Sequence, residues 1–181
     1  TVRKILLEAS VTTELGTTPG SADGRSVFAK FRTPFGLARD ADGNFYVADT
    51  GNNTIRKSTK DGIVTTLAGV AGVGGYVDGA GTSAKFDHPR GLCVDADGTV
   101  YVADEGNARI RRIAADGTVS TLAGDGTQGY KDETGAKAQL NTPRGIALGP
   151  DGNIYVADFG NNAIRLIQKD ASLSLADIAK E

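Results

Sequence analysis

Two arginines and one phenylalanine occupy the middle position of a Pro-Xaa-Gly motif that occurs three times in the chain. These residues are Phe35, Arg90 and Arg144. A guanidinium keeps its positive charge and presents a flat edge of donors that suits carboxylates and phosphates. If the motifs come together in space, the two arginines would attract an anion. The same side chains could instead be solvated, with their stems packed along neighbouring strands.

A second series lies in turns of the form Asp-Xaa-Gly-Asn, where Xaa is Thr50, Glu105 or Phe159. Asp and Asn side chains bond to nearby backbone N–H groups, so turn formation explains why they repeat. The residue between them changes in charge and size from one copy to the next. Because a repeated scaffold keeps its turn chemistry and varies what it displays, we expect the varying residues to contact a ligand.

A third series lies in long glycine-rich segments that hold Tyr76 with Asp78 and Tyr130 with Asp132. Connections of about 18 residues are long and are often functional. Tyrosine is a rigid, amphipathic anchor for recognition. The alternative is structural, with tyrosine packed over a neighbouring unit and aspartate capping a short turn. The predicted ligand-contacting residues are Thr50, Tyr76, Asp78, Arg90, Glu105, Tyr130, Asp132, Arg144 and Phe159.

Residues suited to metal binding or catalysis are scarce. The single cysteine, Cys93, excludes an internal disulfide and a multi-cysteine zinc site, and the single histidine, His88, excludes a three-histidine site. Asp-Ala-Asp-Gly at 40–43 and 95–98 resembles the start of a calcium loop but lacks the later Glu and the flanking helices of an EF-hand. We interpret both segments as hairpin turns. The sequence therefore predicts no catalytic residue, no metal and no cofactor.

The two unique residues also have structural interpretations. His88 precedes a proline, as Thr33 and Thr142 do in the other copies, so it is interpreted as a substituted turn residue. The alternative is a ligand shared across a two-fold axis. Cys93 stands where the other copies have alanine, which predicts a small core residue.

Repetition with a period of about 55 residues organises the whole chain. Tyr-Val-Ala-Asp occurs at 46–49, 101–104 and 155–158, in step with the Pro-Xaa-Gly motif. Asp-Gly and Gly-Asn turns divide each unit into short segments rich in β-branched and aromatic residues. Such matches recurring at one period identify a repeat architecture.

Each unit is predicted to form four short strands. In the first complete unit these strands are residues 36–39, 44–49, 54–58 and 63–67. Consecutive antiparallel strands of this kind form a meander, and repeated four-stranded meanders are typical of a propeller. The predicted fold is an all-β β-propeller of four-stranded antiparallel blades.

One arginine recurs on the third strand of each unit, as Arg3, Arg56, Arg111 and Arg165. The aspartate that ends the second strand of a unit would lie beside it in a meander. We therefore expect these arginines to form structural ion pairs with that aspartate.

These motifs resemble NHL repeats. The Pro-Xaa-Gly strand, Asp-Gly turn, Tyr-Val-Ala-Asp strand, Gly-Asn turn and Ile-Arg strand carry the resemblance from Val2 to about Lys169, and the intervening glycine-rich segments are similar to those of bacterial members. The resemblance implies a six-bladed propeller as the usual closed form. It also implies a scaffold that binds protein or RNA, with related lyases and hydrolases on similar propellers. A shared fold does not by itself define function.

The strand count predicts little more than three blades. We expect a propeller segment at 1–169, with two strands in 1–16, repeats at 31–69 and 86–124, a partial repeat at 140–169, and a tail or weak last strand at 170–181. Propellers close with about 4 to 8 blades. Either a second copy completes a six-bladed ring as a homodimer, its first two strands finishing a shared blade, or the chain is part of a longer propeller.

Composition excludes several classes of partner. The formal net charge is −2, which is too balanced for a protein that binds nucleic-acid phosphates. The chain has no apolar run long enough to span a membrane and shows no signal-peptide pattern. It begins with Thr1 and contains no Met, which suggests a processed product, a trimmed chain or a piece of something longer.

These observations favour a non-catalytic binding or assembly scaffold that recognises a protein or glycan through the varying turns and the long loops. One alternative is a half-propeller, natural or engineered, that self-assembles and binds no ligand. Another is a propeller lyase or hydrolase with an axial metal. The resemblance to bacterial members implies an extracellular or cell-surface location.

Overall fold

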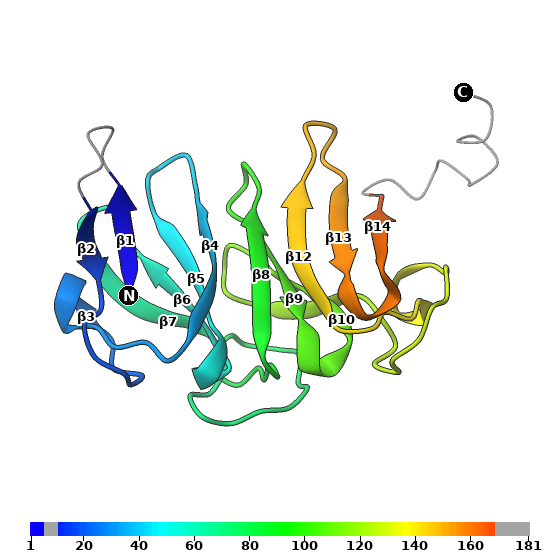
Figure 1. Cartoon of the computed structure of the whole chain (residues 1–181), viewed down its shortest axis with the longest axis horizontal. Helices are drawn as coiled ribbons and strands as arrows, with labels where there is room; N and C mark the ends of the chain where they lie inside the picture. The colour runs from blue at the N-terminus through cyan, green and yellow to red at the C-terminus, as the bar shows by residue number, and fades with distance from the viewer. Residues whose placement is uncertain (6–10, 169–181) are drawn as a thin grey trace.

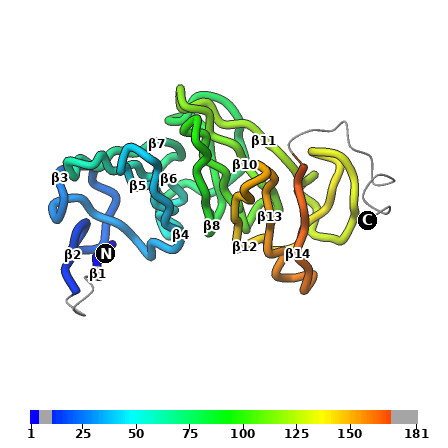
Figure 2. The backbone as a smooth tube through the Cα atoms, turned by 90° about the horizontal axis from the view of Figure 1, so that it is seen from above, coloured from blue at the N-terminus to red at the C-terminus, as the bar shows by residue number. Residues whose placement is uncertain are grey.

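Four antiparallel sheets stand side by side along an open arc in the computed structural model, which describes residues 1–5 and 11–168 (Figure 1). Seen from above, the chain passes from sheet to sheet without returning to an earlier one (Figure 2). The all-β propeller fold predicted from the sequence is confirmed. The tail expected at 170–181 lies outside the described residues.

The sheets hold two, five, four and three strands. The first pairs β1 (Val2–Ile5) with β2 (Val11–Leu15). The second contains β3 (Gly24–Arg25), β4 (Pro34–Arg39), β5 (Phe45–Asp49), β6 (Thr54–Ser58) and β7 (Ile63–Ala68). The third contains β8 (Pro89–Val94), β9 (Val100–Asp104), β10 (Arg109–Ile113) and β11 (Val119–Ala123). The fourth contains β12 (Pro143–Leu148), β13 (Ile154–Asp158) and β14 (Ala163–Ile167).

Short 3₁₀ turns mark the connections. They are η1 (Ser26–Phe28), η2 (Thr50–Asn52), η3 (Glu105–Asn107), η4 (Gly135–Lys137) and η5 (Phe159–Asn161). The turns η2, η3 and η5 follow the second strand of a blade, and each ends in a residue with left-handed backbone. The strand β3 was not expected: Gly24 and Arg25 pair with β7 and form the outer edge of the second sheet.

The Asp-Gly segments are hairpin turns, as the sequence indicates. The Asp40 carboxylate accepts hydrogen bonds from the backbone and side chain of Asn44, both at 2.8 Å, and Gly43 has a φ of +90°. Although burial opposes ionisation, these bonds and one from Tyr46 hold the pKa of Asp40 below its usual value. The carboxylate is therefore used to close the turn.

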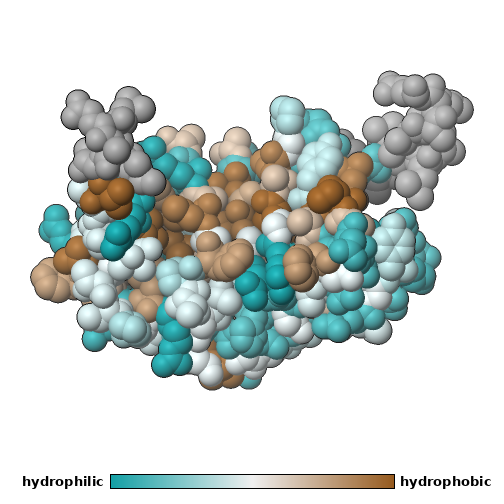
Figure 3. All heavy atoms as spheres, in the orientation of Figure 1, coloured by the Kyte–Doolittle hydropathy of each residue, from teal (hydrophilic) through white to brown (hydrophobic). Residues whose placement is uncertain are grey.

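The core lies between blades. Ile55 and Tyr46 on one blade pack with Leu92 and Val102 on the next, and Phe86 from the intervening loop joins them. Cys93 packs against the following core cluster, where burial raises its thiol pKa to about 12. Cys93 is only partly buried, so it lies at the edge of this core and not within it. Apolar side chains also gather over the upper half of the innermost strands (Figure 3).

The innermost strands β4, β8 and β12 lie next to one another along the arc. This close approach explains the glycine of the Pro-Xaa-Gly motif. A Cβ at Gly36 would collide with the carbonyl oxygen of Arg90, and a Cβ at Gly91 would collide with that of Arg144. The residue just before each glycine is therefore brought to one end of a shared row.

Candidate ligand-binding face

The hairpin turns and the long loops lie at opposite edges of the arc. In Figure 1 the hairpins that join β4 to β5 and β12 to β13 point up, whereas the segment between β7 and β8 runs along the lower edge. The lower edge also carries η2 and η3. We call this lower edge the loop face. It collects the varying turn residues that the sequence singles out.

A charged network of the same composition lies beside the loop face in the second, third and fourth sheets. In the third sheet, Arg111 donates to Asp104 Oδ2 at 2.8 Å and to Asp78 Oδ1 at 2.6 Å, and also to the carbonyls of Lys85 and Val77. Arg56 and Arg165 make the same bonds to the equivalent groups. The predicted pairing with the strand-ending aspartate is confirmed for Arg56, Arg111 and Arg165, whereas Arg3 lies in the two-stranded sheet of β1 and β2, where that aspartate-bearing strand is not present.

This network changes the interpretation of two predicted ligand contacts. Asp78 and Asp132 each accept a hydrogen bond from a buried arginine, Arg111 and Arg165 respectively. Each bond joins residues 33 positions apart in the chain, one on the long loop and one on a strand, so it fixes the loop against the blade. The sequence reasoning missed these pairs, although the matching position of Asp23, which binds Arg56, was a signal for them.

Burial dominates the electrostatics of the strand-ending aspartates. Asp104 is fully buried, and this burial raises its pKa to about 6, against the opposing hydrogen bonds from Asn107, the Asp87 backbone and Arg111. Burial raises the pKa of Asp49 in the same way. These groups are enclosed within the blade and are not presented to a ligand.

The two loop tyrosines lie over arginines of the blades. The Arg109 guanidinium is 3.8 Å from the centre of the Tyr76 ring, and the Tyr76 hydroxyl lies 3.0 Å from Thr121 Oγ1. The Tyr130 ring lies 4.8 Å from the Arg165 guanidinium and is 62% exposed. Tyr130 is the more available of the two for a partner.

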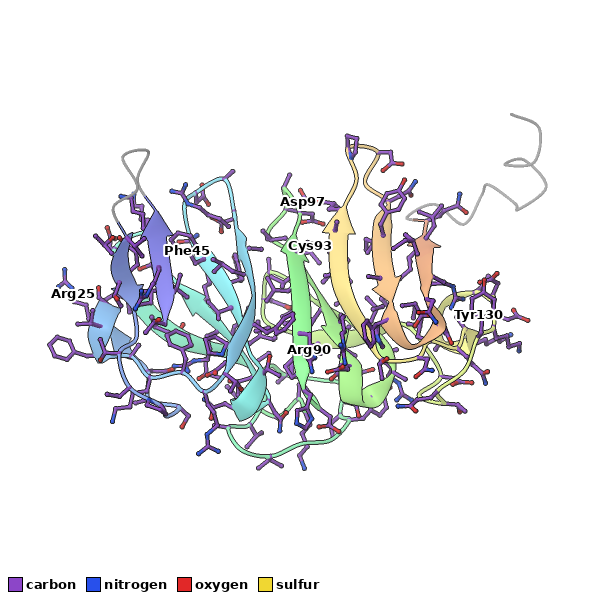
Figure 4. The ribbon with its side chains drawn as sticks, viewed as in Figure 1. Arg25, Phe45, Arg90, Cys93, Asp97 and Tyr130 are labelled. Carbon is purple, nitrogen blue, oxygen red and sulfur yellow. The ribbon has the colours of Figure 1, made fainter. Side chains whose placement is uncertain are left out.

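The innermost strands and the turns bring five predicted or neighbouring residues into one line, which we call the axial row: Phe35, Arg90, Glu105, Arg144 and Phe159. Glu105 accepts hydrogen bonds from Arg90 Nε and, at 2.7 Å, from Arg144 Nε. The Arg90 guanidinium lies 4.8 Å from the Phe35 ring, and that of Arg144 lies 3.7 Å from the Phe159 ring. Figure 4 places Arg90 at the loop-face end of β8, below Cys93 and Asp97.

Thr50 differs from the other two varying turn residues. We expected it to be displayed, but it is buried, because its hydroxyl donates to the carbonyl of Pro89 on the next blade at 2.5 Å. Glu105 also reaches the next blade through Arg144. The varying turn residue therefore spans the junction between innermost strands, which the sequence alone did not show.

His88 takes the conformation of the threonines at the equivalent positions. Its φ is +50°, against +45° for Thr33 and +48° for Thr142, and its Nδ1 lies 2.6 Å from an oxygen of Asp87. This geometry supports the interpretation as a substituted turn residue. Within the described residues, no group of three or more His, Cys, Asp or Glu side chains could hold a metal ion.

The opposite edge holds a pocket that the sequence did not indicate. Its volume is about 240 Å³, and Asp40, Tyr46, Lys57 and Asp97 are among its lining residues. It opens between the hairpin turns of two neighbouring blades.

In the part of the chain that the structure describes, no helix is long and apolar enough to cross a membrane.

Comparison with known sequences gives a family model and a relative that both contain NHL repeats. The sequence model of the NHL repeat matches residues 31–57, 86–113 and 140–165. Human NHL repeat-containing protein 2 is 33% identical over 159 residues, which are 80% of this chain and 22% of that protein.

Solved structures share the fold. A protein of unknown function from Bacteroides thetaiotaomicron has 29% identity and a TM-score of 0.71, covering 88% of this chain and 40% of its own. An auxiliary nutrient binding protein from the same organism has 24% identity and a TM-score of 0.72, covering 92% and 42%. A gluconolactonase from Xanthomonas campestris has 21% identity and a TM-score of 0.50, covering 70% and 35%. This chain therefore spans less than half the length of these relatives.

Proposed function

The chain belongs to the NHL-repeat family, and from that premise we propose that it is a non-catalytic recognition scaffold that binds a protein or glycan ligand through the loop face. The observation that carries this proposal is the contrast between repeated and varied residues. The Arg–Asp–Asn network repeats in all three blades, whereas the residues of the axial row differ from blade to blade. Varied side chains on a constant support are what a recognition surface requires.

Relatives with this fold include both binding proteins and enzymes. The side chains on the loop face favour binding. The carboxylate of Glu105 is held between two arginines, so it is not placed as a free general base. Asp78 and Asp132 are similarly held by buried arginines.

The test is binding of the purified chain to glycan and peptide arrays, followed by equilibrium titration of the best ligand. Tyr130→Ala and Phe159→Ala should each weaken binding at least about tenfold, equal to about 1.4 kcal/mol. Phe28→Ala is the matched control, because Phe28 is an exposed aromatic on η1, a turn that begins with a hydrogen bond to the opposite hairpin edge at Gly62. Equal losses in all three variants, or no ligand on either array, would overturn the proposal.

We also infer that the open face of the last sheet contacts a second copy of the chain. Ile164 is 72% exposed, whereas its equivalents Ile55 and Ile110 are fully buried by the following blade. At the other end, Val11 is 50% exposed whereas its equivalent Val64 is 1% exposed. Each end of the arc therefore exposes an apolar face that a neighbouring blade covers elsewhere in the chain, so the face at one end could pack against the face at the other end of a second copy.

We expect the two copies to pack sheet face against sheet face and not to share a blade. In a shared blade the partner's β1 would pair with β13, but β14 already occupies that edge of β13. The mass in solution should therefore be that of a dimer, and Ile164→Glu should reduce it to that of a monomer. A monomeric wild-type chain at high concentration would contradict this inference.

A further inference from the structure

The centre of the axial row is a charged cluster that occurs once in the described residues. Arg90, Glu105 and Arg144 meet at the junction between the third and fourth sheets. The equivalent junction between the second and third sheets holds Phe35 and Thr50 in place of an arginine and the glutamate, and the fold forms there equally well. The cluster is therefore not required to join two blades, and it does not recur as the network around Arg111 does.

Two guanidinium groups in this cluster keep unused donors. Each guanidinium carries five N–H donors, and Glu105 accepts from the Nε of both arginines. Within residues 1–5 and 11–168, no hydrogen bond joins the Nη atoms of Arg90 or Arg144 to another group. The two side chains are 26% and 34% exposed, so these donor edges face solvent.

The arrangement is organised before any ligand arrives. Two free guanidinium groups would repel each other, but the Glu105 carboxylate, which is only 10% exposed, holds one on each of its oxygens. Ordering the arginines in advance lowers the entropy cost of binding. The formal charge of the cluster is that of two cations and one anion, so one further anion would neutralise it.

Aromatic rings flank the charged centre. The Phe35 ring lies beside Arg90 and is 59% exposed, and the Phe159 ring lies beside Arg144 and is 57% exposed. An anion that binds the guanidinium edges would therefore have apolar surface within reach on both sides. A carboxylate joined to a flat or ring-shaped body fits this pattern, because planar guanidinium edges bind carboxylates in a bidentate way.

From this geometry we propose that Arg90 and Arg144, held by Glu105, form a binding site for a carboxylate group carried on a ring, such as a hexuronate sugar or an aromatic acid. The proposal rests on the proposed recognition function and adds the chemical class of its ligand. The charged centre lies between two described blades, so it does not depend on what covers either end of the arc.

The experiment is a titration of the full chain with D-glucuronate and with benzoate, followed by protein NMR, with glucose and benzyl alcohol as neutral counterparts. The carboxylates should give saturable shifts that weaken with added salt, and the neutral compounds should give none. Glucuronate and benzoate distinguish a sugar body from an aromatic one. The stronger of the two is used for the variants.

Arg90→Ala and Arg144→Ala should each weaken carboxylate binding about tenfold or more, and Arg144→Lys should recover only part of it, since lysine lacks the planar edge. Arg39→Ala is the matched control. Arg39 lies on the innermost strand β4, near the opposite edge, and its guanidinium also lies over a phenylalanine, 5.5 Å from the ring of Phe45.

Absence of saturable binding by both carboxylates, or binding that Arg39→Ala weakens as much as Arg144→Ala does, would overturn this proposal. A neutral ligand found on the arrays that binds Arg90→Ala and Arg144→Ala as tightly as wild type would overturn it while leaving the recognition function intact. If no ligand is found on the arrays but the carboxylates bind saturably, the proposed protein or glycan recognition would be overturned and the carboxylate site would stand.

Discussion

The third and fourth sheets are built from the same repeat but differ in what covers them. Tyr101 and Ile110 are 5% and 0% exposed, whereas their equivalents Tyr155 and Ile164 are 40% and 72% exposed. The sequence motifs and the pairing of the second strand with the third are the same in both. The difference shows that the apolar face carrying these residues is buried by the blade that follows it, so its burial is not a property of the repeat alone.

The charged network behaves differently. Arg111 is fully buried and Arg165 is 9% exposed, and both keep the full set of hydrogen bonds. Its partners come from the blade itself and from the loop that precedes it. This network therefore organises one repeat with its own loop, whereas the apolar core joins one repeat to the next.

The largest expected effect is the loss of the buried arginine. Arg111→Met should lower the free energy of unfolding by about 3–5 kcal/mol, because it leaves the buried Asp104 carboxylate without its cation. Arg165→Met should cost less. Its partner Asp158 is as buried as Asp104, but Arg165 itself is 9% exposed, and its second partner, Asp132, is 66% exposed against 39% for Asp78. Urea denaturation of both variants measures the difference, and equal losses would contradict the comparison.

The next effect concerns the apolar contacts. Ile110→Ala should lower the free energy of unfolding by about 2–5 kcal/mol, because it opens a cavity between blades. Ile164→Ala should change it by less than about 0.5 kcal/mol at low protein concentration, because the side chain is exposed. A larger loss that appears only at high concentration would support the contact with a second copy. A large loss at every concentration would show that the last sheet is covered within one chain.

A smaller effect is expected at the glycine of the Pro-Xaa-Gly motif. Gly91→Ala should cost about 1–3 kcal/mol, because its Cβ would meet the backbone of the neighbouring innermost strand. Gly145→Ala should cost less, since a Cβ there would meet only the Ala157 Cβ, at 3.2 Å, within its own blade. Thermal unfolding of the two variants gives the comparison, and it fails if Gly145→Ala is the more damaging.

The smallest effect is a change with pH inside the central blade. Burial raises the pKa of Asp104 from 3.8 to about 6, so between those values the folded protein holds a proton that the unfolded chain has lost. The contribution of this group to stability therefore falls as the pH rises from about 4 to about 6. Hydrogen bonds from Thr118 lower the pKa of Asp116 in the same sheet, so its contribution has the opposite sign. Carboxyl ¹³C NMR titration should show Asp104 titrating well above Asp116, and the reverse order would contradict the burial argument.

Local features could be predicted from the repeat. The alternation of apolar residues and the Asp-Gly turns indicate the strands from β4 to β14, and the spacing of Arg111 after Asp104 indicates their pairing. Both kinds of contact connect residues that are close in the sequence or adjacent in a meander. The short strand β3 was missed, since it joins a glycine-rich segment to a strand about 40 residues further on.

The candidate site was only partly predictable. Arg90, Glu105 and Arg144 were each selected as varying residues, but nothing in the spacing showed that Glu105 holds both arginines, one of them 39 residues away. Thr50 was selected by the same rule and is buried. Variation identifies positions that differ between repeats, and it does not distinguish a residue that faces solvent from one that faces the next blade.

The sequence by itself determined the repeat: its strands, its hairpin turns and the arginine that ties them together, because these depend on contacts within one unit. Only the tertiary structure decided what each copy of a residue faces. Ile55 and Ile164 occupy the same place in the repeat, yet one is in the core and the other is exposed, because burial depends on the neighbouring blade. The same reason makes Arg90 and Arg144 a site: two innermost strands bring them to one carboxylate.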